Sequence, residues 1–137
     1  MASRLAFKVE REISVDPAVA WSRLSDISAI PRYWRGHRAL EVLEARSGVV
    51  LARVKFAFPG PLNEGLVEIA VEEKLRQVLL HYLRGPFSGR VRNYVAGRLI
   101  GSEWDIALSP IFLPAKPWIR RHFMAGAANA LERIAAP

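Results

Sequence analysis

The chain has 137 residues, of which 51% are hydrophobic and 24% are charged, as expected of one globular domain rather than a disordered segment. It contains no cysteine, which excludes a disulfide scaffold, a thiolate zinc site and a cysteine nucleophile. Lysine and arginine outnumber aspartate and glutamate by 20 to 13, giving a formal net charge of +7, so partners such as RNA or an anionic membrane have to be considered.

The first predicted elements are a strand and two short helices. Phe7 to Val15 alternates apolar and polar residues, which is typical of a half-buried strand, although Arg11 falls on the apolar side. Asp16-Pro17 then provides an N-cap and a first helical residue. A second short helix is predicted around Ile27 to Tyr33.

Six further strands are predicted between His37 and Leu108. Ser47-Gly48 is a hairpin signal, and Pro59-Gly60-Pro61 interrupts the chain after the second of these strands. The predicted segments are His37–Arg46, Val49–Phe58, Glu64–Glu73, a strand carrying Val78, Leu80 and Tyr82, Gly89–Leu99, and a strand carrying Trp104, Ile106 and Leu108. The predicted turns between the last four lie at Lys74-Leu75, Gly85-Pro86 and Ile100-Gly101. The first of these turns pairs Val71 with Val78, Ile69 with Leu80 and Val67 with Tyr82, which keeps one face apolar.

The end of the chain reads as one long helix, Pro117 to Ala135. Its apolar residues recur at helical spacing and form a stripe: Ile119, Phe123, Ala127, Ala130, Leu131 and Ile134. Short loops join successive strands, which predicts an antiparallel meander with the first strand as a seventh member. The fold class is therefore α+β: residues 1–137 form one domain in which a seven-stranded sheet is covered on its apolar face by the terminal helix.

Three stretches, together with the order of elements, carry a resemblance to a known superfamily. They are Ile13 to Trp21, Leu24-Ser25-Asp26 with Pro31-Arg32-Tyr33-Trp34, and Glu41-Val42-Leu43-Glu44 followed by Gly48. They resemble the opening strand, the second helix and the first hairpin of the START-like superfamily, also called SRPBCC, over nearly the whole chain. The resemblance implies the helix-grip fold of the birch-pollen allergen, with a cavity between the curved sheet and the terminal helix. Because the superfamily includes lipid carriers, polyketide cyclases, hormone receptors and quinone-binding proteins, it implies a fold rather than one activity.

Polar and aromatic side chains on the predicted inner face are candidates for ligand binding. On the sheet they are Arg11, Tyr82, Arg84, Asn93 and Trp104. A buried arginine suits a carboxylate or phosphate, because its planar fork binds two oxygens. Arg11 could instead pair with Glu41, if Ser47-Gly48 is a two-residue turn, or with Glu44, if the loop has three residues. A third alternative places Arg11 at a bulge, facing water.

The remaining candidates have both a functional and a structural interpretation. Tyr82 and Asn93 lie on neighbouring strands, where they could bind a ligand carbonyl or hydroxyl, or satisfy each other or a buried water. On the terminal helix, Trp118 and His122 fall beside the apolar stripe and would border the cavity. His122 could act as an acid or base near neutral pH, or be a solvated residue.

Apolar residues also gather on loops that share one end of the meander. The loops 59–62, 85–88 and 109–117 carry Leu62, Phe87, Phe112 and Leu113. These side chains predict a ligand mouth or a partner surface, unless Phe87 and Phe112 plug the core. Prolines at 110, 114 and 117 would stiffen the last loop, and we expect that loop to gate the chamber.

Three functions are compatible with this sequence. The favoured one is a carrier or sensor that binds a small apolar or amphipathic ligand without covalent chemistry. The alternatives are a cyclase or dehydratase that uses Tyr82, Asn93 or His122, and a basic module that contacts RNA, ribosome or an anionic membrane. With three scattered histidines and no cysteine, no metal or other cofactor is predicted.

The sequence also carries an expectation about location and assembly. No apolar run approaches the roughly 20 residues of a membrane helix, and the N-terminus does not resemble a secretory signal. We therefore expect a cytoplasmic protein, either monomer or homodimer.

Overall fold

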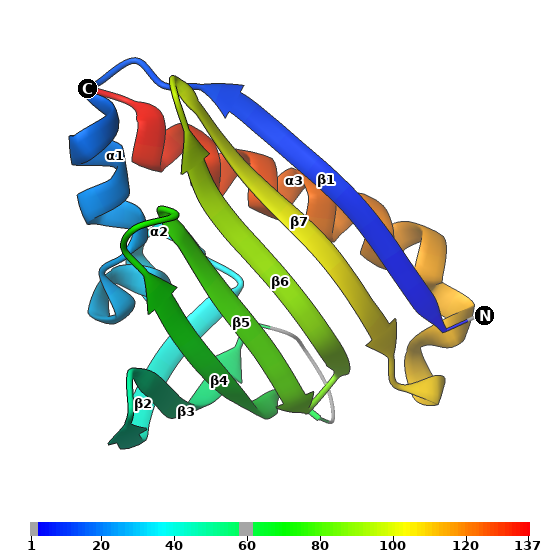
Figure 1. Ribbon diagram of the computed structural model, residues 1–137. Coiled ribbons are helices and arrows are strands. Elements are labelled where there is room, and N and C mark those ends of the chain that lie inside the picture. The colour runs from blue at the N-terminus through cyan, green and yellow to red at the C-terminus, as the bar shows by residue number, and fades with distance from the viewer. Residues whose placement is uncertain (1–2, 58–61) are drawn as a thin grey trace.

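A seven-stranded antiparallel sheet organises the computed structural model, which describes residues 3–57 and 62–137 (Figure 1). The elements are β1 (Arg4–Glu12), α1 (Pro17–Leu24), the 3-10 helix η1 (Ile27–Ala29), α2 (Ile30–Tyr33), β2 (His37–Arg46), β3 (Val49–Phe56), β4 (Glu64–Glu72), β5 (Gln77–Arg84), β6 (Phe87–Ala96), β7 (Leu99–Leu108), the 3-10 helix η2 (Pro110–Ala115) and α3 (Lys116–Ala135). The strand order β1-β7-β6-β5-β4-β3-β2 confirms the predicted meander. The predicted break at Pro59-Gly60-Pro61 lies outside the described residues.

The long helix α3 covers one face of the sheet and contacts β1 and β7, behind which it runs in Figure 1. The predicted stripe is confirmed, since Ile119, Ala127, Ala130, Leu131 and Ile134 are all buried, while Phe123 is half-buried. Helices α1 and α2 pack beside it over the same face. This arrangement, with one apolar sheet face held against a terminal helix, is the predicted helix-grip fold.

The strand registers follow the apolar pattern in the middle of the sheet. Val67 pairs with Tyr82, Ile69 with Leu80 and Val71 with Val78, as predicted. The predicted turn at Ile100-Gly101 is wrong, because Ala96 pairs with Leu99 and the chain reverses at Gly97-Arg98. Gly97 has φ +59°, a conformation that suits glycine in a tight turn.

Two bulges in β2 correct the predicted orientation of its glutamates. Ser47-Gly48 is a two-residue turn, since Arg46 pairs with Val49, and this turn was expected to point Glu41 inward. However, the pairing shifts by one residue between Val42 and Glu44, which reverses every side chain beyond Leu43. Glu41 therefore faces solvent, where it accepts a hydrogen bond of 2.8 Å from Arg53.

Two arginines expected on the inner face lie in solvent instead. Arg11 comes at the end of β1, near the last turns of α3, and its half-exposed side chain lies 3.7 Å from the carboxylate of Glu132. The predicted inward arginine and its pairing with Glu41 or Glu44 are therefore wrong. Arg84 is exposed because the register of β4 and β5 shifts between Leu66 and Val67.

The C-terminal end of α3 is tied to the first part of the chain. Arg23 on α1 donates from Nη1 to the carbonyls of Ile134 and Ala136, at 2.9 and 2.7 Å. Arg133 donates to the carbonyl of Tyr33 at 2.8 Å. These bonds satisfy carbonyl groups at a helix end that have no partner within the helix, and they join α1, α2 and α3.

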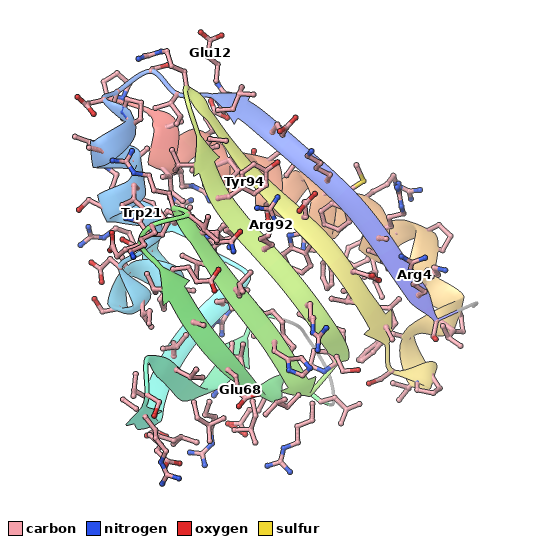
Figure 2. All side chains as sticks on the ribbon, in the orientation of Figure 1. Arg4, Glu12, Trp21, Glu68, Arg92 and Tyr94 are labelled. Atoms are coloured by element: carbon pink, nitrogen blue, oxygen red, sulfur yellow. The ribbon has the colours of Figure 1, made fainter. Side chains whose placement is uncertain are left out.

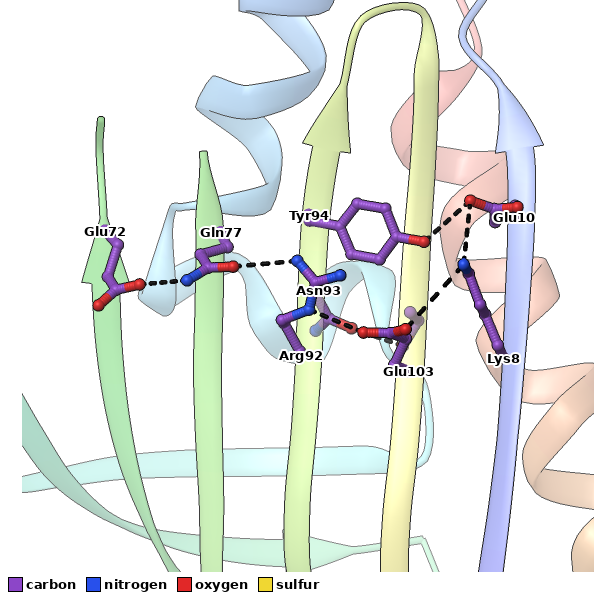
Figure 3. A network of polar contacts seen from close by, with 9 residues as sticks. Lys8, Glu10, Glu72, Gln77, Arg92, Asn93, Tyr94 and Glu103 are labelled. Carbon is purple, nitrogen blue, oxygen red and sulfur yellow. Dashed lines mark hydrogen bonds and ion pairs between the residues drawn. The ribbon is translucent and has the colours of Figure 1, made fainter. Parts of the chain in front are cut away.

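The outer face of the sheet carries a continuous polar network. Figure 2 shows Arg4, Glu68, Arg92 and Tyr94 on this face, and Figure 3 shows the contacts that cross β4, β5, β6, β7 and β1. The members are Glu72, Gln77, Arg92, Glu103, Lys8, Glu10 and Tyr94. The outer charges of these strands are therefore largely paired with one another.

Candidate functional site

A cavity of about 240 Å³ lies between α3 and the sheet. Its rim is formed by the segment after α2 and by one face of α3, and its walls come from β2, β3, β6 and β7. The lining residues are Trp34, Arg35, Gly36, His37, Phe56, Ala57, Phe87, Trp104, His122, Phe123, Gly126 and Ala127. A much smaller void, of about 10 Å³, shares Trp34, His37 and Trp104 with it and reaches Tyr82 and Asn93.

Aromatic side chains form most of the cavity wall. Phe87 is the centre of the cluster: its ring centroid lies 5.4 Å from Phe56, 5.4 Å from Phe123 and 6.0 Å from Trp104. The tilted and edge-on arrangements are those that the ring quadrupoles favour. These rings belong to the hydrophobic core or pack against it, so the cavity has an apolar wall built from the core itself.

One buried polar pair lies at this wall. Nε2 of His37 and the hydroxyl of Tyr82 are 2.6 Å apart, and both side chains are almost wholly buried. Burial lowers the pKa of His37 to about 4, because the charged imidazolium loses its hydration. The same loss of hydration raises the pKa of Tyr82. At neutral pH the pair is therefore an uncharged imidazole next to an uncharged phenol.

The second ring nitrogen of His37 is reachable from the cavity. No partner is recorded for Nδ1 among the described residues, whereas every side-chain nitrogen or oxygen there that is sealed from solvent has one. Nδ1 is therefore not sealed, and His37 lines the cavity. Nδ1 is thus a polar atom in the cavity lining that has no partner among the described residues.

A second polar chain lies beside the first and is already satisfied. Trp104 donates from Nε1 to the hydroxyl of Ser102 at 2.8 Å, and Ser102 donates to Oδ1 of Asn93 at 2.5 Å. Asn93 was expected to act with Tyr82. It is instead committed to Ser102, and this bond fixes the indole of Trp104 in the cavity wall.

The predicted ligand residues are only partly brought together. Tyr82, Asn93 and Trp104 are buried beside the chamber as predicted, while Arg11 and Arg84 are on the surface. His122 lies on the rim, where its ring stacks on that of Trp118 with the centroids 4.8 Å apart. Trp118 itself is 54% exposed and does not line the cavity.

Of the four residues predicted to form the mouth, all within the part of the chain that the structure describes, only Phe87 lines the cavity. Phe87 lines the chamber, but it is buried in the wall. Leu62, Phe112 and Leu113 are not among the described residues of the lining. Leu62 is exposed, and Phe112 and Leu113 pack half-buried against the core. The described part of the rim is instead made by Arg35, Gly36, His122 and Gly126.

His37 is the residue of the candidate site that sequence reasoning missed. Counting back from the two-residue turn at Ser47-Gly48 places His37 opposite Phe58, an inward position of the predicted strand Val49–Phe58 that lies outside the described residues. Two register shifts of one residue each, one before Ala39 and one before Glu44, add up to two residues, so His37 stays on the inner face and pairs with the buried Phe56. Alternation in the sequence therefore indicated that His37 faces inward. The same count wrongly predicted that Glu41 faces inward as well.

A second hollow, of about 930 Å³, is a broad groove on the outer face of the sheet. Charged side chains border it, among them Arg4, Arg92, Glu103 and Asp105, and these pair with each other. In the described part of the chain, no three His, Asp or Glu side chains are grouped to hold a metal ion. No helix within residues 3–57 or 62–137 has both the length and the apolar character needed to cross a membrane.

Comparison with known proteins identifies the fold. No protein-family model matches the sequence, and neither does any curated protein. Among solved structures, the Zhui aromatase/cyclase from Streptomyces sp. R1128 is 14% identical, with a TM-score of 0.71 over 96% of this chain and 93% of that chain. Norcoclaurine synthase from Thalictrum flavum, solved with dopamine and hydroxybenzaldehyde, is 16% identical, with a TM-score of 0.67 over 96% and 86%.

A third similar structure is major latex-like protein 151 of Panax ginseng. It is 13% identical, with a TM-score of 0.65 over 98% of this chain and 99% of that chain. Together the three likenesses show that this chain has the helix-grip fold, as its sequence motifs predicted.

Proposed function

We propose that the protein binds a small apolar or amphipathic molecule in the cavity between α3 and the sheet. The observation that carries the proposal is the aromatic wall around Phe87, with a buried polar side chain, His37, in the same lining. Concave, mostly apolar spaces with few polar groups are the usual form of a small-molecule site. Binding of this kind requires no covalent step.

The size of the cavity limits the ligand. Pockets for drug-sized ligands span about 300–1,000 Å³, whereas this one has about 240 Å³. A cavity of about 150 Å³ holds benzene, so the same proportion gives a ligand of about ten non-hydrogen atoms. The part of the proposed ligand that the cavity holds is therefore about the size of a substituted single ring.

The neighbouring structures support the same class of ligand. Norcoclaurine synthase was solved with dopamine and hydroxybenzaldehyde, which are single-ring aromatic compounds. The aromatase/cyclase neighbours favour an enzyme as the second candidate. The observation in its favour is the uncharged His37–Tyr82 pair, which could polarise a carbonyl or transfer a proton at the cavity wall. Asn93 and His122, expected to help, are respectively bonded to Ser102 and placed at the rim.

Contact with RNA or an anionic membrane has less support. Several arginines of the outer face and of β3 pair with carboxylates: Arg4 with Asp105, Arg92 with Glu103, and Arg53 with Glu41. A surface on which cations are paired in this way offers fewer free charges to phosphate groups.

Binding of an apolar probe tests the proposal. α-Methylstyrene has nine non-hydrogen atoms and should bind the wild-type protein near 1:1, which NMR titration measures. A side chain added at Gly126 meets nothing within 4 Å, so Gly126→Leu should fold normally, extend into the cavity rim and weaken binding. Ala128→Leu, on the exposed side of α3, is the matched control. Absence of binding to the wild type, or equal binding to both variants, would contradict the proposal.

A search for the natural ligand complements the titration. Native mass spectrometry of the purified protein, under gentle and then denaturing conditions, should release a co-purified small molecule.

A further inference from the structure

The protons of the His37–Tyr82 pair determine what the chamber can recognise. An uncharged imidazole carries one proton on its two nitrogens, and the other nitrogen is an acceptor. The phenol of Tyr82 keeps its own proton and can donate or accept. The 2.6 Å contact between Nε2 and the hydroxyl therefore allows two arrangements, which differ in what Nδ1 presents to the cavity.

Burial of Tyr82 decides between them. Its hydroxyl has His37 as its only partner among the described residues, and the side chain is 2% exposed. If Nε2–H donated to the phenol oxygen, the O–H of Tyr82 would have no acceptor, and an unsatisfied buried donor is costly. If Tyr82 donates to Nε2, its proton is satisfied and the ring proton of His37 lies on Nδ1. The second arrangement leaves Nδ1–H facing the cavity.

Most other polar side chains that line the cavity are also hydrogen-bond donors. Trp34 and Arg35 line the cavity, and neither side chain has a hydrogen-bond partner recorded among the described residues. Trp104 is a donor as well, but its N–H is bound to Ser102. Only His122, at the rim, has a side chain able to accept. The chamber is thus mostly apolar, and its polar groups are mainly hydrogen-bond donors. It complements a ligand that accepts a hydrogen bond and has no donor group of its own.

We propose that Nδ1–H of His37, held in that tautomer by Tyr82, is a fixed hydrogen-bond donor to the carbonyl oxygen of a small aromatic ketone or aldehyde. The inference deepens the proposed ligand-binding function and rests on it. A hydroxyl ligand fits less well, since its own proton would need an acceptor that the described inner wall does not offer. His37 acts as a binding residue that touches the ligand, and Tyr82 acts as a positioning residue.

A pair of isosteric probes tests the donor. Acetophenone and α-methylstyrene have the same shape and differ only in C=O against C=CH₂. We expect the wild type to bind acetophenone about three- to tenfold more tightly, which is the effect of one hydrogen bond between neutral groups. His37→Phe should bind both probes equally. Tyr82→Phe should lose most of the preference, because Nε2 then has no donor to fix the tautomer.

Tyr94→Phe is the matched control. It also removes a tyrosine hydroxyl from β6, the strand next to β5, but that hydroxyl bonds Glu10 on the outer face. The control should keep the full preference for acetophenone.

A measurement on the unmodified protein does not depend on the folding of any variant. ¹⁵N–¹H NMR of the histidine ring should show His37 protonated at Nδ1, and acetophenone should shift that resonance. Protonation at Nε2 would overturn the inference, as would equal binding of the two probes or a preference that persists in His37→Phe. In those cases the binding of α-methylstyrene still supports the proposed function. If neither probe binds, the proposed function and the inference both fail.

Discussion

The hydroxyl of Tyr82 and Nε2 of His37 lie 2.6 Å apart, although 45 residues and two intervening strands of the sheet separate them. His37 belongs to the edge strand β2, and Tyr82 to the central strand β5. A flat sheet would keep these strands well apart, so the contact depends on the curvature that brings β2 over the apolar face. The polar pair in the cavity wall therefore forms only because the sheet is curved.

Burial of His37 makes folding dependent on pH. The folded chain protonates His37 at a pKa of about 4, and the unfolded chain near 6.5. Below pH 6.5 the unfolded state therefore takes up a proton that the folded state does not, and stability falls until the pH reaches about 4. The difference corresponds to about 3 kcal/mol. Urea unfolding between pH 7 and pH 4 measures it.

Two variants isolate the contribution of this histidine. His37→Phe should remove that part of the pH dependence, whereas His122→Gln, which changes an exposed histidine at the cavity rim, should retain it. An unchanged pH dependence in His37→Phe would show that His37 is not the buried group responsible.

Gly101 is expected to tolerate no side chain. The ring of Tyr94 covers it from the neighbouring strand, and a Cβ at Gly101 would overlap the ring and its hydroxyl. That ring is held by a 2.9 Å bond to Glu10 and by the guanidinium of Arg92, 4.1 Å from its centroid. Gly101→Ala should therefore lower the free energy of unfolding by about 1–3 kcal/mol, as overpacking does.

Removing the ring tests this explanation. In a Tyr94→Ala background the added methyl group has space, so the cost of Gly101→Ala should largely disappear in a double-mutant cycle. Additive losses in urea unfolding would show that Tyr94 is not the obstacle.

The link between α1 and the end of α3 should contribute measurably to stability. Arg23→Ala removes the donor to the carbonyls of Ile134 and Ala136, and we expect a loss of about 1–2 kcal/mol. Arg32→Ala, an exposed arginine on α2, should change the free energy of unfolding little. Equal effects of the two substitutions in thermal unfolding would contradict a specific role for Arg23.

The segment from Ser109 to Pro117 was expected to gate the cavity, and the structure leads to a different expectation. Phe112 and Leu113 pack against the core and are absent from the described lining. The double variant Phe112→Ala/Leu113→Ala should therefore lose about 2–4 kcal/mol of stability and release α-methylstyrene at an unchanged rate. Stopped-flow release, measured at a temperature where the variant is folded, checks this. Faster release would restore the gating hypothesis.

The apolar pattern was sufficient to predict the order of elements, the covering helix and the central registers. Alternation at Val67, Ile69 and Val71 favours the strand register that keeps the apolar face continuous, and the structure has this register. The pattern could not predict the bulges, because an extra residue such as Leu43 leaves no signal in a strand that is mostly exposed. The orientations of Glu41 and Arg84 were therefore wrong.

The candidate site was harder to predict than the fold, for a physical reason. Tyr82 and Trp104 were found because they interrupt an aliphatic face. His37 lies at the first position of its strand, so few neighbours in that strand reveal which face it is on, and its partner Tyr82 is three strands away in the sheet. Arg11 was misplaced because alternation says which face a residue is on, but not how far the covering helix extends over that face.

The two bulges of β2 also affect how the molecule behaves at high concentration. β2 is an edge strand whose second side is unpaired in the sheet, and such an edge can take on a strand from another copy of the protein. Edge-to-edge association of this kind requires a regular spacing of free N–H and C=O groups. The irregularities near Arg38 and Leu43 interrupt that spacing, so the distortion that places His37 in the chamber also opposes growth of the sheet into aggregates.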